Sequence, residues 1–210
     1  MREILLIGGG GHCRACIDVI ERESKYQIAG IIDDNLYDNQ IQEVLGYPVL
    51  GKDKDLKLLR KQYQYALITI GQIKTPLPRL KLYQKLKNLA YTLPVIISPL
   101  AYLARNVHIE EGTIIMHHAL INTSSKVGKM CIINTKALIE HDCIIENFCH
   151  ISTGAILNGG CKVEEQTFIG SNMGIRHGIS IHKKQAIYTN LYQAGGGGGN
   201  GISHIFGIAS

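Results

Sequence analysis

Residues 134–156 read "NTKALIEHDCIIENFCHISTGAI", and an isoleucine stands at every sixth position: Ile139, Ile145 and Ile151. The step continues in both directions, because an aliphatic residue occupies every sixth position from Ile97 to Ile187 without an insertion. If such residues fill roughly a quarter to a third of an ordinary sequence, chance does not explain the run. A fixed short period predicts a repeat fold.

A second position, two residues before each aliphatic one, is mostly occupied by a small residue. Four of the six cysteines fall there, and we interpret them as small core residues. They are Cys131, Cys143, Cys149 and Cys161. Residues that tolerate tight or left-handed corners follow several aliphatic positions, among them Gly128, Asn134 and Gly170. The pattern indicates a hexapeptide β-helix over residues 95–187, in which three hexads form one triangular coil.

Positions three hexads apart lie above one another in such a stack, at a strand spacing of roughly 4.8 Å. His141 then lies beside Gly159, and Asp142 beside Gly160. We expect the missing side chains to leave room next to the His–Asp pair. His177 lies two coils from His141, roughly 9.6 Å away. Because no two histidines are adjacent in the stack, we expect no metal site within the chain.

Residues 1–94 alternate between strand and helix patterns, which predicts a small Rossmann-like parallel sheet. "ILLIGGGGH" leads into an amphipathic run over Cys13–Arg22, a second strand ends at "IAGIIDD", and a helical pattern covers Pro78–Leu89. A glycine loop at a helix N-terminus can hold a phosphate, and Asp33 can bind a ribose or a base edge. The dinucleotide fingerprint is incomplete, because Cys13 stands where it needs glycine. Phosphate binding and a merely tight turn therefore both stay open. His12 could contact a ligand or cap the helix.

Composition points to an ordinary globular protein with a net charge of +5. Much of this charge comes from Lys52–Lys87, which we interpret as a solvated helical face, because the basic residues are not interleaved with aromatic ones as nucleic-acid binding would require. Met1–Ile7 lacks the basic n-region and the small-residue cleavage site of a secretory signal peptide. No apolar run is long enough to span a membrane. We therefore expect a cytoplasmic protein with free thiols and without nucleic-acid or membrane partners.

A small Rossmann-like domain with Gly8–His12 and Asp33–Asp34, followed by a β-helix that carries the quoted block, resembles a known family. This is the sialic-acid O-acetyltransferase and bacterial UDP-4-amino-sugar N-acetyltransferase family, the hexapeptide-repeat sugar acyltransferases. The resemblance covers residues 1 to about 181. It implies a left-handed β-helix, a homotrimer, acetyl-CoA bound between neighbouring subunits and a UDP-linked sugar held by the N-terminal domain. The period itself does not give the hand of the coil.

The resemblance also implies roles for single residues. His141 matches the catalytic base, and Asp142 matches the acidic neighbour that raises its basicity; the alternative for His141 is an exposed histidine at a coil corner. Matched acetyl-CoA contacts are His150, Gly159 and Ser171. Matched nucleotide-sugar contacts are His12, Cys13, Arg14, Asp33, Asp34, Asn35 and Gly71.

The chemistry of such a site needs no metal, because a thioester is already an activated acyl donor. The enzyme has to align an amine or hydroxyl with the thioester and remove a proton, for which a neutral imidazole beside a carboxylate is suited. We expect direct transfer without an acyl-cysteine, because the coil cysteines point inward.

The tail departs from the family pattern after Ile181. Gln185 replaces the small residue of its hexad, and five glycines follow at 195–199. We expect residues 188–210 to form a Gly-rich tail without fixed structure, which puts late coenzyme A contacts and the capping of the β-helix in doubt.

The leading hypothesis is an acetyl-CoA-dependent acetyltransferase that acts on an amino group or hydroxyl of a nucleotide-linked or sialic-acid-type sugar. One alternative is a non-catalytic scaffold or nucleotide-sugar-binding protein. Another is a dehydrogenase-like NAD-binding protein, against which Cys13 in the glycine loop and the β-helix argue. The sequence identifies neither the sugar nor the nucleophilic atom.

Overall fold

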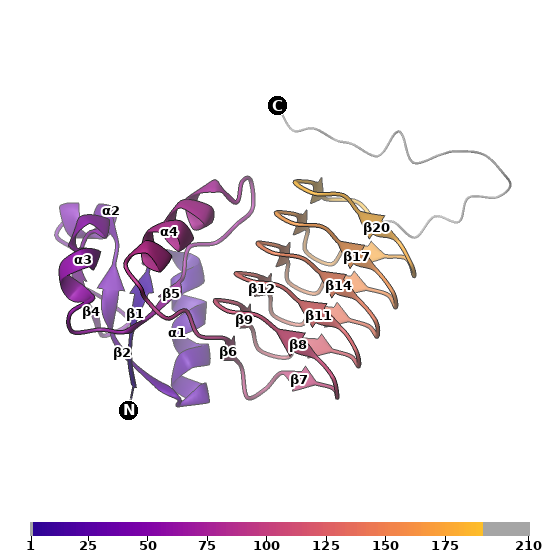
Figure 1. The fold of residues 1–210 in the computed structure, drawn as a ribbon, viewed down its shortest axis with the longest axis horizontal. Coiled ribbons are helices and arrows are strands. Elements are labelled where there is room, and N and C mark those ends of the chain that lie inside the picture. Colours follow the sequence, from indigo (N-terminus) through magenta and orange to yellow (C-terminus); the bar gives the residue numbers. More distant parts are fainter. Residues whose placement is uncertain (1, 191–210) are drawn as a thin grey trace, which may run out of the picture.

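The structure is a computed structural model and describes residues 2–190. It has two parts that lie side by side, an α/β domain at the N-terminus and a stack of triangular coils (Figure 1). Within residues 2–190, no helix is long and apolar enough to cross a membrane. The tail prediction falls largely on residues 191–210, which lie outside the described part. Tyr188 packs against Phe168, and Asn190 accepts a hydrogen bond from the backbone N–H of Gly174.

The N-terminal domain is built on one sheet with the strand order β3-β4-β2-β1-β5. Its strands are β1 (Arg2–Ile7), β2 (Tyr26–Ile32), β3 (Glu43–Val44), β4 (Tyr47–Gly51) and β5 (Tyr65–Ile68). The central pairs are parallel, as the sequence predicts, but β3 runs antiparallel to β4. The hairpin between them turns through Leu45 and Gly46, both at positive φ. Two-residue turns of this kind match the twist of paired strands.

Four α-helices and one 3-10 helix accompany this sheet. They are α1 (Gly11–Glu23), α2 (Asp34–Asp38), η1 (Asp53–Asp55), α3 (Leu56–Leu59) and α4 (Leu77–Asn88). The predicted helices over Cys13–Arg22 and Pro78–Leu89 correspond to α1 and α4. Ser24 caps the C-terminal end of α1. It adopts a left-handed conformation and donates its backbone N–H to the carbonyl of Ile20.

The stack is a parallel β-helix of two-residue strands arranged in three sheets. The first sheet holds β6 (Ile96–Ile97), β9 (Ile114–Ile115), β12 (Ile132–Ile133), β15 (His150–Ile151), β18 (Phe168–Ile169) and β21 (Ala186–Ile187). The second holds β7 (Tyr102–Leu103), β10 (Leu120–Ile121), β13 (Leu138–Ile139), β16 (Ile156–Leu157) and β19 (Gly174–Ile175). The third holds β8 (His108–Ile109), β11 (Lys126–Val127), β14 (Ile144–Ile145), β17 (Lys162–Val163) and β20 (Ser180–Ile181).

The register of these sheets is the one that the six-residue period predicts. Leu138 pairs with Leu120 on one side and with Ile156 on the other, each one coil away. The inward aliphatic residues and the small residues before them form one buried cluster, which includes Ile139, Ile145 and the four coil cysteines. All six cysteines are buried and unpaired.

The left-handed corners lie elsewhere than predicted. They fall three residues after the aliphatic positions, as at Asp142 with φ 59° and Gly160 with φ 68°. Gly128 and Gly170 do not form left-handed corners. They are glycines because the backbone of the next coil approaches too closely to leave room for a side chain. A Cβ on Gly128 would lie 2.9 Å from the backbone nitrogen of Asn147, and one on Gly170 would lie 2.8 Å from the carbonyl oxygen of Ile187.

An apolar contact joins the two parts of the molecule. Side chains of α1, among them Cys16 and Ile20, pack with the outer residues Ile96, Ile114 and Ile132 of the first sheet. The first sheet is therefore covered by the N-terminal domain over its early coils.

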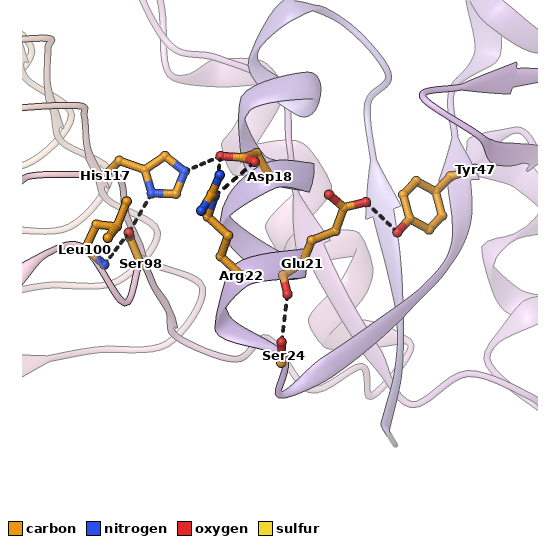
Figure 2. A network of polar contacts seen from close by, with 8 residues as sticks. All are labelled: Asp18, Glu21, Arg22, Ser24, Tyr47, Ser98, Leu100 and His117. Atoms are coloured by element: carbon orange, nitrogen blue, oxygen red, sulfur yellow. Dashed lines mark hydrogen bonds and ion pairs between the residues drawn. The ribbon is translucent and has the colours of Figure 1, made fainter.

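A polar network lies beside this contact (Figure 2). His117, from the β-helix, lies 2.5 Å through Nε2 from the carboxylate of Asp18 on α1, and 2.6 Å through Nδ1 from the hydroxyl of Ser98. Because a carboxylate only accepts, Nε2 carries the proton and the Ser98 hydroxyl donates to Nδ1. The bond from His117 holds the pKa of Asp18 below its usual range. The carboxylate of Glu23 also accepts a hydrogen bond from the backbone of Ile97. These directional bonds fix how α1 lies on the first sheet.

We predict that Ile145→Ala lowers the free energy of unfolding by about 2–5 kcal/mol, because Ile145 is buried in the coil core and the change leaves a cavity. The neighbouring Ile144 is the matched control, since it points outward and is 42% exposed. Ile144→Ala should cost less than about 1 kcal/mol. Urea denaturation of both variants measures the difference, and equal losses would contradict the inward register.

Candidate active site

His141 and Asp142 form a pair at the turn between β13 and β14. The Nδ1 atom of His141 lies 2.8 Å from a carboxylate oxygen of Asp142, and both side chains are substantially exposed. Because the carboxylate only accepts, it favours the tautomer with the proton on Nδ1. The Nε2 atom then keeps its lone pair and can accept a proton. The left-handed backbone of Asp142 turns its side chain back toward the ring that precedes it.

Gly159 lies beside this imidazole in the next coil. A Cβ on Gly159 would lie 2.6 Å from Nε2 of His141 and 3.1 Å from Nδ1 of His177, so any larger residue would displace the rings. The expected open space beside the His–Asp pair is therefore partly filled by the two imidazoles. Their ring centroids are 6.3 Å apart, closer than the two-coil spacing, because the rings lean toward each other over the glycine.

His150 lies away from this corner, at the junction of the two domains. It is 5% exposed and packs edge-on against Phe168, with ring centroids 5.1 Å apart. Its Nδ1 donates to the carbonyl of Gln72 at 2.6 Å, and Asn134 donates to its Nε2 at 3.1 Å. Burial lowers the pKa of His150 to about 4, and the charge of Arg79 acts in the same direction. His150 is thus a neutral imidazole whose two nitrogens both have partners.

Arg79 on α4 is a buried cation that the sequence analysis did not single out. Its guanidinium donates to the carbonyls of Ile68, Ile70 and Met130, at 2.8–3.0 Å. The interpretation of Lys52–Lys87 as a solvated face is wrong for this residue, which is 0% exposed. Burial lowers its pKa to about 10, so it stays charged at neutral pH.

The charge of Arg79 also affects the pKa of His12, which lies at the start of α1. Burial lowers the pKa of His12 to about 3, with Arg79 as the next cause. His12 does not cap α1, since the cap residue is Gly10 and offers no side chain, and its ring lies 3.5 Å from the thiol of Cys16. Gly71 is its neighbour, because a Cβ on Gly71 would lie 3.9 Å from that of His12.

A cavity of about 430 Å³ opens at the carboxyl ends of β1, β2 and β5. Its walls include Asp33, Asp34, Asn35 and two lysines, Lys81 and Lys85. Both carboxylate oxygens of Asp33 already accept backbone hydrogen bonds, one from Gly9 at 2.8 Å and one from Leu36 at 3.0 Å. Asp33 thereby holds the glycine loop to the start of α2.

The remaining predicted site residues lie apart from one another. Cys13 is buried in the domain core, and Arg14 is exposed on α1. Ser171 lies at a corner between the first and second sheets, where its hydroxyl is 3.0 Å from that of Ser152. Among residues 2–190, no three His, Cys, Asp or Glu side chains gather as a group that could hold a metal ion.

One chain therefore presents three separate groups of predicted residues. His141, Asp142 and Gly159 share the corner between the second and third sheets. His12, Gly71 and His150 lie at the domain junction, and Asp33–Asn35 line the cavity. In a triangular coil, the corner between two sheets lies opposite the remaining sheet. The corner of His141, between the second and third sheets, therefore lies opposite the first sheet, which the N-terminal domain covers.

Comparison with known proteins agrees with this architecture. Residues 3–86 match the PglD N-terminal domain family. The structure is similar to a histidine variant of perosamine N-acetyltransferase from Caulobacter crescentus, solved with CoA and GDP-perosamine. The two share 28% sequence identity and a TM-score of 0.74, over 90% of this chain and 92% of the other. The chain is an acyltransferase that resembles the hexapeptide-repeat sugar acyltransferases. No curated protein sequence matches it.

Two further solved structures share the fold of this acyltransferase at lower identity. The acetyltransferase domain of PglB from Neisseria gonorrhoeae is 24% identical over 89% of this chain and 96% of the other, with a TM-score of 0.66. WeeI from Acinetobacter baumannii is 20% identical over 90% and 95%, with a TM-score of 0.71. The match of residues 3–86 and the perosamine N-acetyltransferase structure confirm the resemblance to hexapeptide-repeat sugar acyltransferases and the predicted left-handed β-helix, and the two further structures agree in fold.

We predict that the imidazole of His150 in this acyltransferase stays neutral down to about pH 5, because its pKa is lowered to about 4. The folded state favours the neutral ring, so its contribution to stability is complete above about pH 6.5 and is lost as the pH falls toward 4. An NMR titration of the ring Cε1 proton, assigned by comparison with His150→Phe, measures this. A midpoint near 6.5 would contradict the buried, doubly bonded environment.

Proposed function

We propose that this acyltransferase transfers an acetyl group from acetyl-CoA to an amino group, or a hydroxyl, of a nucleotide-linked sugar, with His141 as the general base. The observation that carries the proposal is the His141–Asp142 pair, in which the half-exposed imidazole keeps its Nε2 free as a proton acceptor beside Gly159. The perosamine N-acetyltransferase solved with CoA and GDP-perosamine supports the same class of reaction.

The proposed reaction is a direct transfer. The acceptor nitrogen attacks the thioester carbonyl, a C–N bond forms, and the C–S bond breaks. Nε2 of His141 takes the proton that the nitrogen loses, and this proton passes on to the thiolate of coenzyme A. Asp142 holds the ring in the required tautomer and stabilises the imidazolium while it exists.

The N-terminal cavity is the proposed site of the nucleotide part of the acceptor. Its carboxylates and Asn35 can accept from the N–H and O–H groups of a base or ribose, and Lys81 and Lys85 supply positive charge for the diphosphate. The start of α1 offers a second phosphate contact. It has no acidic residue in its first turn, no capping side chain, and open space beside Gly10 and Gly11.

A cleft of about 300 Å³ between the loop Gln72–Leu77 and the late coils is the proposed path of the coenzyme A arm. Phe168 and Ala186 form its floor, and Lys74 and Lys184 can neutralise phosphate groups. Gln72 is buried, and its side-chain oxygen has no partner among the described residues. An amide N–H of the pantetheine arm is a suitable donor for it.

We propose that the enzyme works as a homotrimer. The cavity lies within the N-terminal domain, which covers the first sheet, whereas His141 lies at the opposite corner, so a second copy has to bring base and acceptor together. The outer face of the second sheet supports such an assembly, because it is a ladder of apolar side chains. They are Tyr102, Leu120, Leu138 and Ile156. Exposed apolar faces of this extent are typical of interfaces.

We predict that His141→Asn lowers the rate of thiol release from acetyl-CoA by about 10²–10⁴-fold, the usual contribution of a positioned base. Asp142→Asn should lower it less, since the base remains. The acceptors are UDP- and GDP-linked amino sugars and free sialic-acid-type sugars. His182→Asn is the matched control, because the side chain of this exposed histidine pairs, within the described part of the chain, with Glu164 alone, at 3.8 Å.

Full turnover by His141→Asn would refute the assigned base. Absence of turnover by the wild-type protein with every acceptor would refute the proposed function and favour a non-catalytic sugar-binding role. Thermal melting of each variant separates loss of chemistry from loss of fold.

A further inference from the structure

We infer that His177 is an acceptor-binding residue that selects an amine over a hydroxyl as the nucleophile; this inference rests on the proposed function. His177 lies in the same column as His141, two coils further along, with Gly159 between them. The two rings approach to 6.3 Å between centroids and are tilted by 49°. They are thus neighbours across one glycine.

The nitrogen atoms of the two rings face the same point. The position of a Cβ on Gly159 is 2.6 Å from Nε2 of His141 and 3.1 Å from Nδ1 of His177. These separations are close to hydrogen-bond length. A ligand atom cannot occupy that position, which is next to the glycine Cα, but one lying just outside it can reach both nitrogens.

The surrounding glycines keep this place free of other side chains. Gly160 and Gly178 follow Gly159 and His177 at the same corner, and both have positive φ. A Cβ on Gly178 would meet nothing within 4 Å, and one on Gly160 would lie 3.9 Å from the ring of His177. The approach to the two nitrogens is therefore open toward solvent.

The surroundings of His177 differ from those of the structural histidines. His117 and His150 each have hydrogen-bond partners on both ring nitrogens, and one partner of each, Asp18 or Gln72, belongs to the N-terminal domain. Within residues 2–190, no hydrogen bond or ion pair to His177 is present, and its side chain is exposed. Its nitrogens are thus free for a ligand.

The chemistry that suits two convergent imidazoles is that of a primary amine. A neutral amine has two N–H bonds and one lone pair. One N–H faces Nε2 of His141, which removes its proton, and the other donates to the lone pair of Nδ1 of His177. The amine lone pair then points away from both rings, toward the acyl carbon. His177 only accepts a hydrogen bond, and the product amide keeps the N–H that faces it.

A hydroxyl acceptor cannot donate to both nitrogens. It has one O–H, so it satisfies either the base or His177, and the other imidazole gains no bond. The pair therefore favours nitrogen as the nucleophile, a choice that the sequence leaves open.

The test compares His177→Leu with His177→Asn in the full-length protein. Leucine fills a similar space without an acceptor, whereas the Oδ1 atom of asparagine can stand where Nδ1 stands. Each variant is assayed for thiol release with an amino sugar and with its hydroxyl analogue, both nucleotide-linked. His182→Leu is the matched control, and thermal melting checks the fold.

We predict that His177→Leu lowers kcat/KM for the amine by roughly ten- to a hundredfold, the usual effect of losing one hydrogen bond in a site. It should change kcat/KM for the hydroxyl analogue by less than about twofold, and His177→Asn should restore most of the amine activity. An equal fall for both acceptors, an unchanged amine rate, or a failure of asparagine to restore it would each overturn the inference. These outcomes leave the proposed function standing, because the wild-type protein still turns over. Absence of wild-type turnover overturns both.

Discussion

The register between coils is the constraint on which the rest of the structure depends. Each corner residue donates its backbone N–H to the carbonyl one coil below, as Gly160 does to His141 and Gly178 to Gly159, both at 2.9 Å. A slip of one residue would turn the inward aliphatic residues outward, so the buried core holds the register. The same register fixes the column of His141, Gly159 and His177. The core thus determines where the chemical groups lie.

Burial separates the histidines of this column from those at the domain junction. His150 is enclosed and close to the cation of Arg79; burial and this charge favour its neutral form and outweigh the hydrogen bond to the carbonyl of Gln72, which raises the pKa. It is suited to shaping a site and holding the loop at Gln72. His141 has one partner and one free nitrogen, which is what proton transfer requires. Two histidines only nine positions apart therefore serve different purposes.

The sequence alone predicts whatever depends on the six-residue period: the strands, the inward residues, the pairing of coils and the neighbourhood of His141 and Gly159. It does not predict what depends on contacts between distant segments. The burial of His150 and Arg79 arises only because the N-terminal domain packs on the first sheet, and no local pattern carries that information. Likewise, the two-coil spacing gives the separation of His141 and His177 along the stack, but side-chain rotation brings the rings closer. The sequence also predicts the left-handed corners at the wrong position of the hexad. It suggests the residue directly after each aliphatic one, where Gly128 and Gly170 stand, but these glycines are needed for the close approach of the next coil, and residues such as Asp142 adopt the positive φ.

The consecutive glycines at 159 and 160 are difficult to explain by stability alone. Gly160 has the positive φ that glycine adopts without strain, yet Ser124 and Asp142 take the same conformation in the coils below it. Gly159 has no positive φ, so its place in the turn between β16 and β17 does not by itself require glycine. A purely structural corner would therefore carry a side chain at both positions. The glycine at 159 allows the two imidazoles to approach each other and leaves their nitrogens uncovered, which serves the proposed acceptor site and not the fold.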